Sequence, residues 1–261
     1  MNPTVGTPLD VRLMNFTAWA LMLAFVALGA FTAGRWLARL PQFDIRRITV
    51  TGEVSHNNVV TLRANVAPRL TGTFFSVDLQ RVRAAFEAVP WVRRAVVRRE
   101  FPNRLRVDLQ EHQPVAYWGT DGELRLINSF GEVFEANVGE VEQETLPRLN
   151  GPDGQSADVL AMYRLLNPMF EQLDLAVDQL EVSKGGSWQA RLDSGAQIEF
   201  GRGSAEVLQA RTARFLKMVT QVAARYSRRV TSLESADLRH ENGFAIRLRG
   251  VSTAASVLPR K

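Results

Sequence analysis

A long run of uncharged residues near the N-terminus constrains this chain more than any other feature. From Leu13 to Gly34 the sequence reads LMNFTAWALMLAFVALGAFTAG, which is 22 residues without a charge. A helix rises about 1.5 Å per residue, so this run spans a hydrocarbon core of about 30 Å. A cleaved signal peptide is the alternative, but the run is too long and no convincing cleavage site follows it. We therefore predict one uncleaved transmembrane helix at residues 13–34, preceded by a short tail at residues 1–12.

The charges that flank this helix bear on its orientation. Arg12 precedes the run, whereas Arg35, Arg39, Arg46 and Arg47 follow it. By the positive-inside tendency, these charges place the C-terminal part of the chain in the cytoplasm. That tendency weakens for large translocated domains, and the absence of Cys is compatible with either side of the membrane.

Residues 43–113 predict a small α+β domain. Its elements are expected in the order strand, helix, helix, strand, strand, at residues 43–52, 55–70, 76–89, 91–100 and 104–112. Ser76 is placed to cap the second helix, and Pro90 ends it. Trp91 follows that proline at the start of a strand, so we expect it to fill the space between helix and sheet.

Residues 114–250 predict a β-rich domain with flanking helices, and residues 251–261 a C-terminal tail. Strands are expected at residues 124–128, 132–136, 177–182, 188–192, 196–200, 230–239 and 244–249, and helices at residues 157–173 and 206–226. Pro168 is expected to disturb the first of these helices. Asn242-Gly243 suits a tight turn between the last two strands. The predicted fold class is α+β with one transmembrane helix.

The sequence offers little for catalysis or for cofactor binding. It has no Cys and only three His (His56, His112 and His240), which excludes thiol chemistry and leaves little room for a metal site. Gly201-Arg202-Gly203 lies between a strand and a helix but lacks the further Gly and the Lys of a phosphate-binding loop. Glu111 and His112 resemble an acid–base pair, but adjacent strand residues point to opposite faces, so we expect a surface role for both. We predict no enzyme, no cofactor and no metal.

The formal net charge is +5, yet no basic run carries interleaved aromatic residues. Acidic protein partners or a membrane surface therefore match this charge better than nucleic acid does.

The last pair of strands predicts a binding edge. A strand at the edge of a sheet can accept a partner strand through its backbone hydrogen bonds. The candidate partner-binding residues are Arg239, His240, Phe244, Ile246, Arg247, Leu248 and Arg249. The alternative is a covered hairpin with solvated arginines.

Short motifs spread over roughly residues 13–250 resemble those of a known family. In the first predicted domain they are Val50-x-Gly52, Phe75-x-x-Asp78, Pro90-Trp91-Val92, Ala95-x-Val97-x-Arg99, the Pro102 turn and Glu111-x-x-Pro114-Val115-Ala116. In the second they are Leu126-Ile127-Asn128-x-x-Gly131-x-Val133-Phe134, Ser187-Trp188-Gln189, Phe200-Gly201-Arg202-Gly203 and Asp237-Leu238-Arg239. The chain thereby resembles the FtsQ/DivIB family of bacterial cell-division proteins, with a POTRA domain (β-α-α-β-β) followed by the β domain of the proteobacterial FtsQ type.

This resemblance implies a non-catalytic, single-pass type II protein of the inner membrane at the division septum. The N-terminus is then cytoplasmic and the bulk of the chain periplasmic, against the orientation that the flanking charges favour. The resemblance also implies FtsB and FtsL as partners of the β domain, with Arg239 and Arg247 meeting partner carboxylates. FtsK and other division proteins are implied as partners of the anchor and POTRA domain.

One departure from the family and two alternative functions go with this expectation. Family members can carry basic residues just before the Ser-Trp-Gln strand, where this chain has Lys184-Gly185-Gly186. The alternatives are a POTRA-type chaperone for outer-membrane or secreted β proteins and an anchored periplasmic enzyme that acts on the cell wall.

Overall fold

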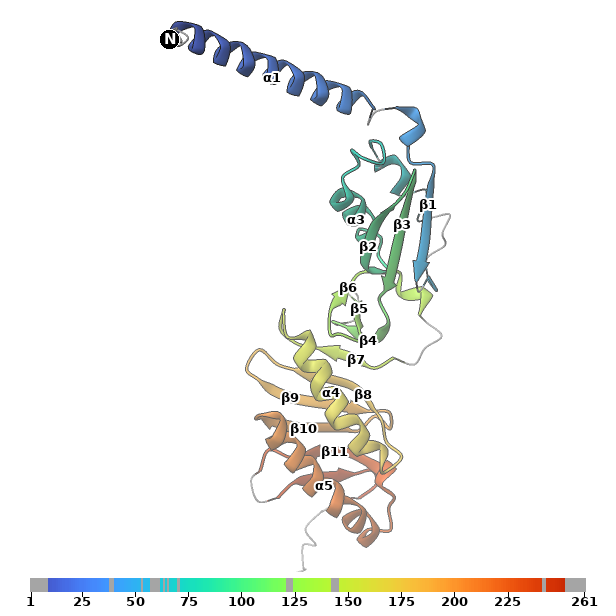
Figure 1. The fold of residues 1–261 in the computed structure, drawn as a ribbon. Helices are drawn as coiled ribbons and strands as arrows, with labels where there is room; N and C mark the ends of the chain where they lie inside the picture. The colour runs from blue at the N-terminus through green and yellow to red at the C-terminus, as the bar shows by residue number, and fades with distance from the viewer. Residues whose placement is uncertain are drawn as a thin grey trace, which may run out of the picture. The chain divides into compact units, whose positions relative to one another are not determined.

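The N-terminal apolar run lies within one long helix, α1 (Leu9–Leu37; Figure 1). The computed structural model describes residues 9–37, 40–52, 54–56, 62, 64, 66–69, 71–120, 124–141, 146–240 and 243–251. Residues 10–37 are long and apolar enough to cross a membrane by length and composition, and no second helix among the described residues meets that test. Large side chains of α1 such as Phe16 and Phe25 are exposed, as lipid-facing side chains are.

The described chain forms two compact units, and the boundary between them lies between Glu111 and His112. The first unit contains, after α1, the elements η1 (Pro41–Phe43), β1 (Arg47–Gly52), η2 (Ala67–Arg69), α3 (Leu79–Glu87), β2 (Val92–Glu100) and β3 (Arg104–Glu111). Its sheet has the order β1-β3-β2, in which β3 runs parallel to β1 and antiparallel to β2. Alternate residues of β3, such as Leu105 and Val107, are fully buried in the core that α3 also lines.

Two local predictions in this unit are wrong. The first strand begins at Arg47 rather than at residue 43, because Pro41–Phe43 form a 3-10 turn before it. The cap of α3 is Asp78, whose carboxylate accepts hydrogen bonds from the first turn. Ser76 instead accepts a hydrogen bond from a backbone N–H earlier in the same loop. Half of the predicted helix at residues 55–70 lies outside the described residues.

The second unit contains a larger sheet and two helices. Its elements are β4 (Pro114–Trp118), β5 (Arg125–Asn128), β6 (Val133–Phe134), η3 (Val138–Glu140), β7 (Arg148–Asn150), α4 (Ser156–Glu171), β8 (Val177–Val182), β9 (Ser187–Leu192), β10 (Gln197–Arg202), α5 (Ala205–Arg225), η4 (Val230–Ser232), β11 (Leu233–Asp237) and β12 (Ala245–Leu248). The sheet order of the described strands is β12-β11-β10-β9-β8-β7-β4-β5-β6. The fold class is therefore α+β, as predicted.

The two helices of this unit connect parallel strands and cover the core. α4 connects β7 to β8 and α5 connects β10 to β11, and both pairs of strands are parallel. Figure 1 shows both helices on the same face of the sheet. Large side chains between the helices and the sheet are fully buried, among them Phe170 of α4, Phe215 of α5 and Phe200 of β10. Side chains that alternate with these, such as Gln189 and Arg191, lie on the other face, which is polar.

The sequence did not predict two strands of the second unit, β4 and β7. The expected disturbance at Pro168 does not end α4. β4 starts at a proline, and β7 has only three residues beside a Pro/Gly-rich stretch, so neither shows an alternating pattern of useful length. α4 continues through Pro168 to Glu171.

Candidate partner-binding edge

β12 is the terminal strand at one end of the nine-stranded sheet. It pairs antiparallel with β11, with Asp237 opposite Ala245, Ala236 opposite Ile246, Ser235 opposite Arg247 and Leu233 opposite Leu248. In the part of the chain that the structure describes, no strand pairs with its outer side. The predicted turn at residues 242–243 lies partly outside that part. Among the strands that the structure describes, β12 therefore has an outer backbone edge with no strand paired to it.

The backbone of β12 shows which groups this edge offers. The N–H of Arg249 donates to the carbonyl of Ser232 at 2.9 Å, on the side of β11. Polar backbone groups alternate between the two sides of a strand, so those of Ile246 and Leu248 fall on the outer side. The carbonyl of Leu248 accepts from the N–H of Val251 at 3.1 Å, which closes one end of the edge. The N–H and C=O of Ile246 are thus the central outward groups that a partner strand could pair with.

The apolar side chains of this segment pack mainly against the domain itself. Phe244 is half-buried and meets Phe215 of α5 edge to face, with ring centroids 5.2 Å apart. Ile246 is half-buried against the same core, and Leu248 is 5% exposed within it. These side chains fix the strand in place, so a partner reaches the backbone of the edge more readily than it reaches these apolar groups.

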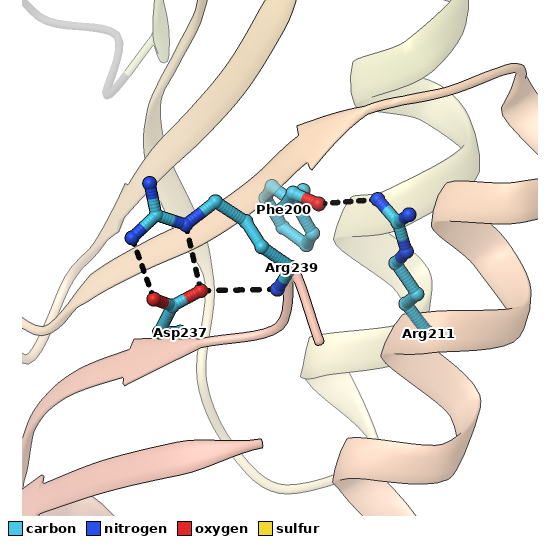
Figure 2. A network of polar contacts seen from close by, with 4 residues as sticks. All are labelled: Phe200, Arg211, Asp237 and Arg239. Atoms are coloured by element: carbon cyan, nitrogen blue, oxygen red, sulfur yellow. Dashed lines mark hydrogen bonds and ion pairs between the residues drawn. The ribbon is translucent and has the colours of Figure 1, made fainter. Parts of the chain in front are cut away.

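Arg239 is held by Asp237, two residues earlier, as Figure 2 shows. The Arg239 Nε and Nη2 atoms donate to the two carboxylate oxygens of Asp237 at 2.9 and 2.6 Å, and its backbone N–H donates to Oδ1 at 3.0 Å. The hydrogen bonds from Arg239 lower the pKa of Asp237 to about 2. The guanidinium is therefore oriented at the surface, on the side of β11 that faces β10, rather than free to move.

Gly201 and Arg211 complete this arrangement, and neither was predicted to have a role there. Gly201 has φ +77°, and a Cβ at that position would lie 2.7 Å from Cγ of Arg239. Its strand bulges between Glu199 and Gly201. Arg211 of α5 donates to the carbonyl of Phe200 at 2.7 Å beside the bulge, as Figure 2 shows. It also donates to the carbonyl of Arg202 at 2.9 Å. The motif Phe200-Gly201-Arg202-Gly203 is the sequence feature that could have pointed to this arrangement.

The remaining predicted residues lie in different surroundings. Arg247 is exposed, and its Nη1 lies 3.7 Å from Glu234 in a loose surface pair. Arg249 donates from Nη2 to the carbonyl of Ser194 at 2.7 Å, which ties it to the turn between β9 and β10. His240 is exposed. The structure thus places these groups on or beside β12, with Arg249 held more closely than Arg247.

The pair Glu111 and His112 does not have the surface role that the sequence predicts. Glu111 is 4% exposed, and its Oε2 accepts hydrogen bonds from the backbone N–H groups of Ser55 and His56 at 2.9 and 3.0 Å. The ring of His112 stacks on Phe134 with centroids 4.1 Å apart. Among the described residues, no group of three or more His, Asp or Glu side chains could hold a metal ion.

Comparison with known proteins decides the family. A family model described as POTRA domain, FtsQ-type, matches residues 43–112, and one described as Cell division protein FtsQ/DivIB, C-terminal, matches residues 116–239. The chain belongs to the FtsQ/DivIB family of cell-division proteins. The resemblance in the sequence motifs is thereby confirmed.

Relatives named Cell division protein FtsQ match both units of the chain. The protein of Thiomonas arsenitoxydans is 42% identical over 94% of this chain and 89% of its own length. The protein of Burkholderia pseudomallei is 39% identical over 93% of this chain and 94% of its own length. The protein of Bordetella pertussis is 35% identical over 92% of each of the two chains. This FtsQ/DivIB chain is thus a cell-division protein with a POTRA domain, a candidate membrane anchor and other division proteins as its partners. β12 lies beyond the residues that the C-terminal family model matches.

Proposed function

We propose that this chain is a non-catalytic scaffold of the division machinery that binds FtsB and FtsL through the edge strand β12. The free outer edge of β12 carries the proposal. In it, residues 13–34 span the inner membrane as a single-pass type II anchor, with residues 1–12 cytoplasmic. Residues 43–113 form the POTRA domain and residues 114–250 the β domain, both periplasmic at the septum, and residues 251–261 form a tail. The anchor and the POTRA domain contact FtsK and other division proteins.

Binding is by addition of a partner strand to the sheet. The partner's backbone hydrogen-bonds to the outward N–H and C=O of Ile246. Arg247 lies on the exposed polar face of the same strand, where its guanidinium meets a carboxylate of the partner. Arg239, oriented by Asp237, offers its remaining N–H groups beside the strand. Backbone pairing supplies affinity, and the two arginines supply register.

A proline at residue 246 tests the backbone part of this proposal. Ile246→Pro removes an N–H that the partner strand needs and that β11 does not use, so we expect it to abolish binding of the FtsB periplasmic segment to the full chain in detergent. Ile246→Ala is the matched control, because it shortens the same side chain but keeps the N–H. Binding is measured by pull-down and titration, with circular dichroism to show that each variant is folded. Undiminished binding by a folded Ile246→Pro chain contradicts strand addition without touching the family assignment.

A charge reversal tests the arginine. Arg247→Glu is expected to weaken FtsB binding by a few fold, which corresponds to about 0–1 kcal/mol for an exposed charge. Arg191→Glu is the control, since Arg191 is an exposed strand residue of the same sheet in β9, away from the edge. Equal effects of the two reversals would show that only the overall charge of the domain matters.

A fusion after Lys261 tests the orientation. A reporter that is active only in the periplasm is expected to be active there. Activity of a cytoplasm-only reporter at the same position would show that the flanking charges set the topology instead.

A further inference from the structure

Loops of the first unit meet at the end of its sheet where the chain arrives from α1. The segment after α1 contacts the loop before α3, because the N–H of Phe74 donates to the carbonyl of Phe43 at 2.7 Å. It also contacts the turn between β2 and β3, because the N–H of Arg46 donates to the carbonyl of Asn103 at 3.0 Å. These backbone hydrogen bonds fasten the loops into one surface.

Each of these loops contributes aromatic rings to that surface. Phe43 meets Phe75 with centroids 4.9 Å apart, Phe75 meets Phe74 at 5.2 Å, and Phe74 meets Phe101 at 6.0 Å, all edge to face. We call this set of four phenylalanines the juxtamembrane aromatic patch. Phe75 is 50% exposed and Phe101 is 72% exposed. Among the described residues 40–111, no other large apolar side chain is exposed to this degree.

The patch is held rigidly. Arg99 donates from Nε to the carbonyl of Phe74 and from Nη2 to the carbonyl of Val77, each at 2.7 Å. The backbone N–H of Thr73 donates to the hydroxyl of Ser76 at 2.9 Å in the same loop. Because the loop is fixed by these contacts, the exposure of Phe75 is a property of the folded domain. Apolar groups gathered at one exposed spot mark an interaction surface.

The chain itself keeps this patch close to a membrane. α1 ends at Leu37, and Phe43 follows six residues later. An extended chain spans at most about 3.6 Å per residue, so Phe43 lies within roughly 22 Å of the end of the membrane helix in any arrangement of the domain. Three exposed basic residues lie beside the patch, namely Arg46, Arg47 and Arg104. The acidic residues there are Asp44 and Glu100, so basic groups are in excess. Exposed phenylalanine rings with an excess of basic groups beside them fit the interfacial region of an anionic bilayer.

We propose that the juxtamembrane aromatic patch docks on the anionic phospholipid surface of the membrane that α1 spans, with the rings of Phe75 and Phe101 at headgroup depth. The tether makes this docking intramolecular, so a small patch is sufficient. Docking fixes the POTRA domain against the bilayer instead of leaving it to swing on its linker. The proposal rests on the membrane anchor of the proposed function, but it involves neither β12 nor the sidedness of the membrane, so the failure of one can be told from the failure of the other.

The absence of Cys in the chain allows a clean test with single labels. The full chain carrying Asn103→Cys is labelled with an environment-sensitive nitrobenzoxadiazole dye and reconstituted into vesicles of phosphatidylcholine and phosphatidylglycerol. Gln110→Cys, an exposed position toward the other end of β3, is the matched control. We expect a doxyl-labelled lipid to quench the dye at residue 103 and aqueous iodide to quench it weakly, with the reverse at residue 110. Equal behaviour at both positions overturns the proposal.

Substitution of the two exposed rings makes the test specific. Phe75→Ser combined with Phe101→Ser is expected to reduce lipid quenching at residue 103 to the level of residue 110. Phe130→Ser, at an exposed ring in the second unit, is expected to leave it unchanged. Melting curves show that the double variant is folded, since neither ring is buried. Quenching that survives the double substitution overturns the proposal.

Two further measurements complete the design. Vesicles of phosphatidylcholine alone are expected to give weaker lipid quenching, and an unchanged signal contradicts a role for anionic headgroups. Shielding of the dye from iodide without quenching by the lipid overturns the proposal in favour of a protein that covers the patch.

Discussion

The imidazole ring of His56 stacks on the indole of Trp91, with ring centroids 4.0 Å apart and the two planes 10° from parallel. Trp91 is 4% exposed, so its side chain is buried, whereas its place between helix and sheet stays a prediction. The stacked imidazole also comes from the segment whose backbone N–H groups bind Glu111. One aromatic side chain and one carboxylate thus fix the chain just after β1.

Trp91→Ala is expected to destabilise the POTRA domain by about 3–5 kcal/mol, because truncation of a buried aromatic side chain leaves a cavity. The measurement is the melting temperature of the purified chain together with its level in cells. Unchanged stability with loss of a partner would show that Trp91 serves binding instead.

Glu111→Ala is expected to cost about 1–3 kcal/mol, because it leaves the N–H groups of Ser55 and His56 without their acceptor. Glu111→Gln is the matched control and should cost less, since the amide keeps one acceptor oxygen. Hydrogen exchange at the two amides reports the effect locally. Equal protection in all three proteins would argue that other groups hold this segment.

Gly201→Ala is expected to displace Arg239 and to cost about 1–3 kcal/mol, because a Cβ would lie 2.7 Å from Cγ of Arg239 and φ is +77°. Gly154→Ala is the matched control: φ there is +82°, but nothing lies within 4 Å of the added Cβ. The difference in melting temperature between the variants isolates the contact with Arg239. No difference would mean that the arginine moves aside freely.

Asp237 gives a pH dependence whose direction follows from its lowered pKa. The group titrates near 3.8 when unpaired and at about 2 in the folded chain, so its stabilising contribution is present above pH 3.8 and is lost as pH falls toward 2. Because the pair is partly exposed, the contribution is about 1 kcal/mol or less. The melting temperature of Asp237→Asn is expected to lie below that of the parent at neutral pH and to approach it at acid pH. A gap that widens on acidification contradicts this assignment.

The sequence predicts an element where its pattern extends over several residues. Leu105 and Val107 alternating with arginines predicted β3, whereas α1 was predicted from its lack of charge. The sequence did not predict β7, because the three residues of that strand form no pattern.

The other features that the sequence did not predict depend on contacts between residues far apart in the chain. Glu111 looks like a surface residue from its neighbours, and only the return of Ser55 to the end of β3 makes its burial favourable. At the candidate site, the edge position of β12 was predictable from its place near the end of the chain. The contact of Arg239 with Gly201 was not, since it depends on a bulge in β10.

The order of strands in the second unit has a mechanical consequence. β4, by which the chain enters the sheet, lies six strands from β12, or about 29 Å at roughly 4.8 Å per strand. Any tension between a partner on β12 and the entering chain crosses every ladder on that path. The shortest is β4–β7, with Tyr117 opposite Arg148 and Trp118 opposite Leu149. Under load, the sheet should therefore part first at the strands next to its attachment, while the edge that holds the partner stays intact.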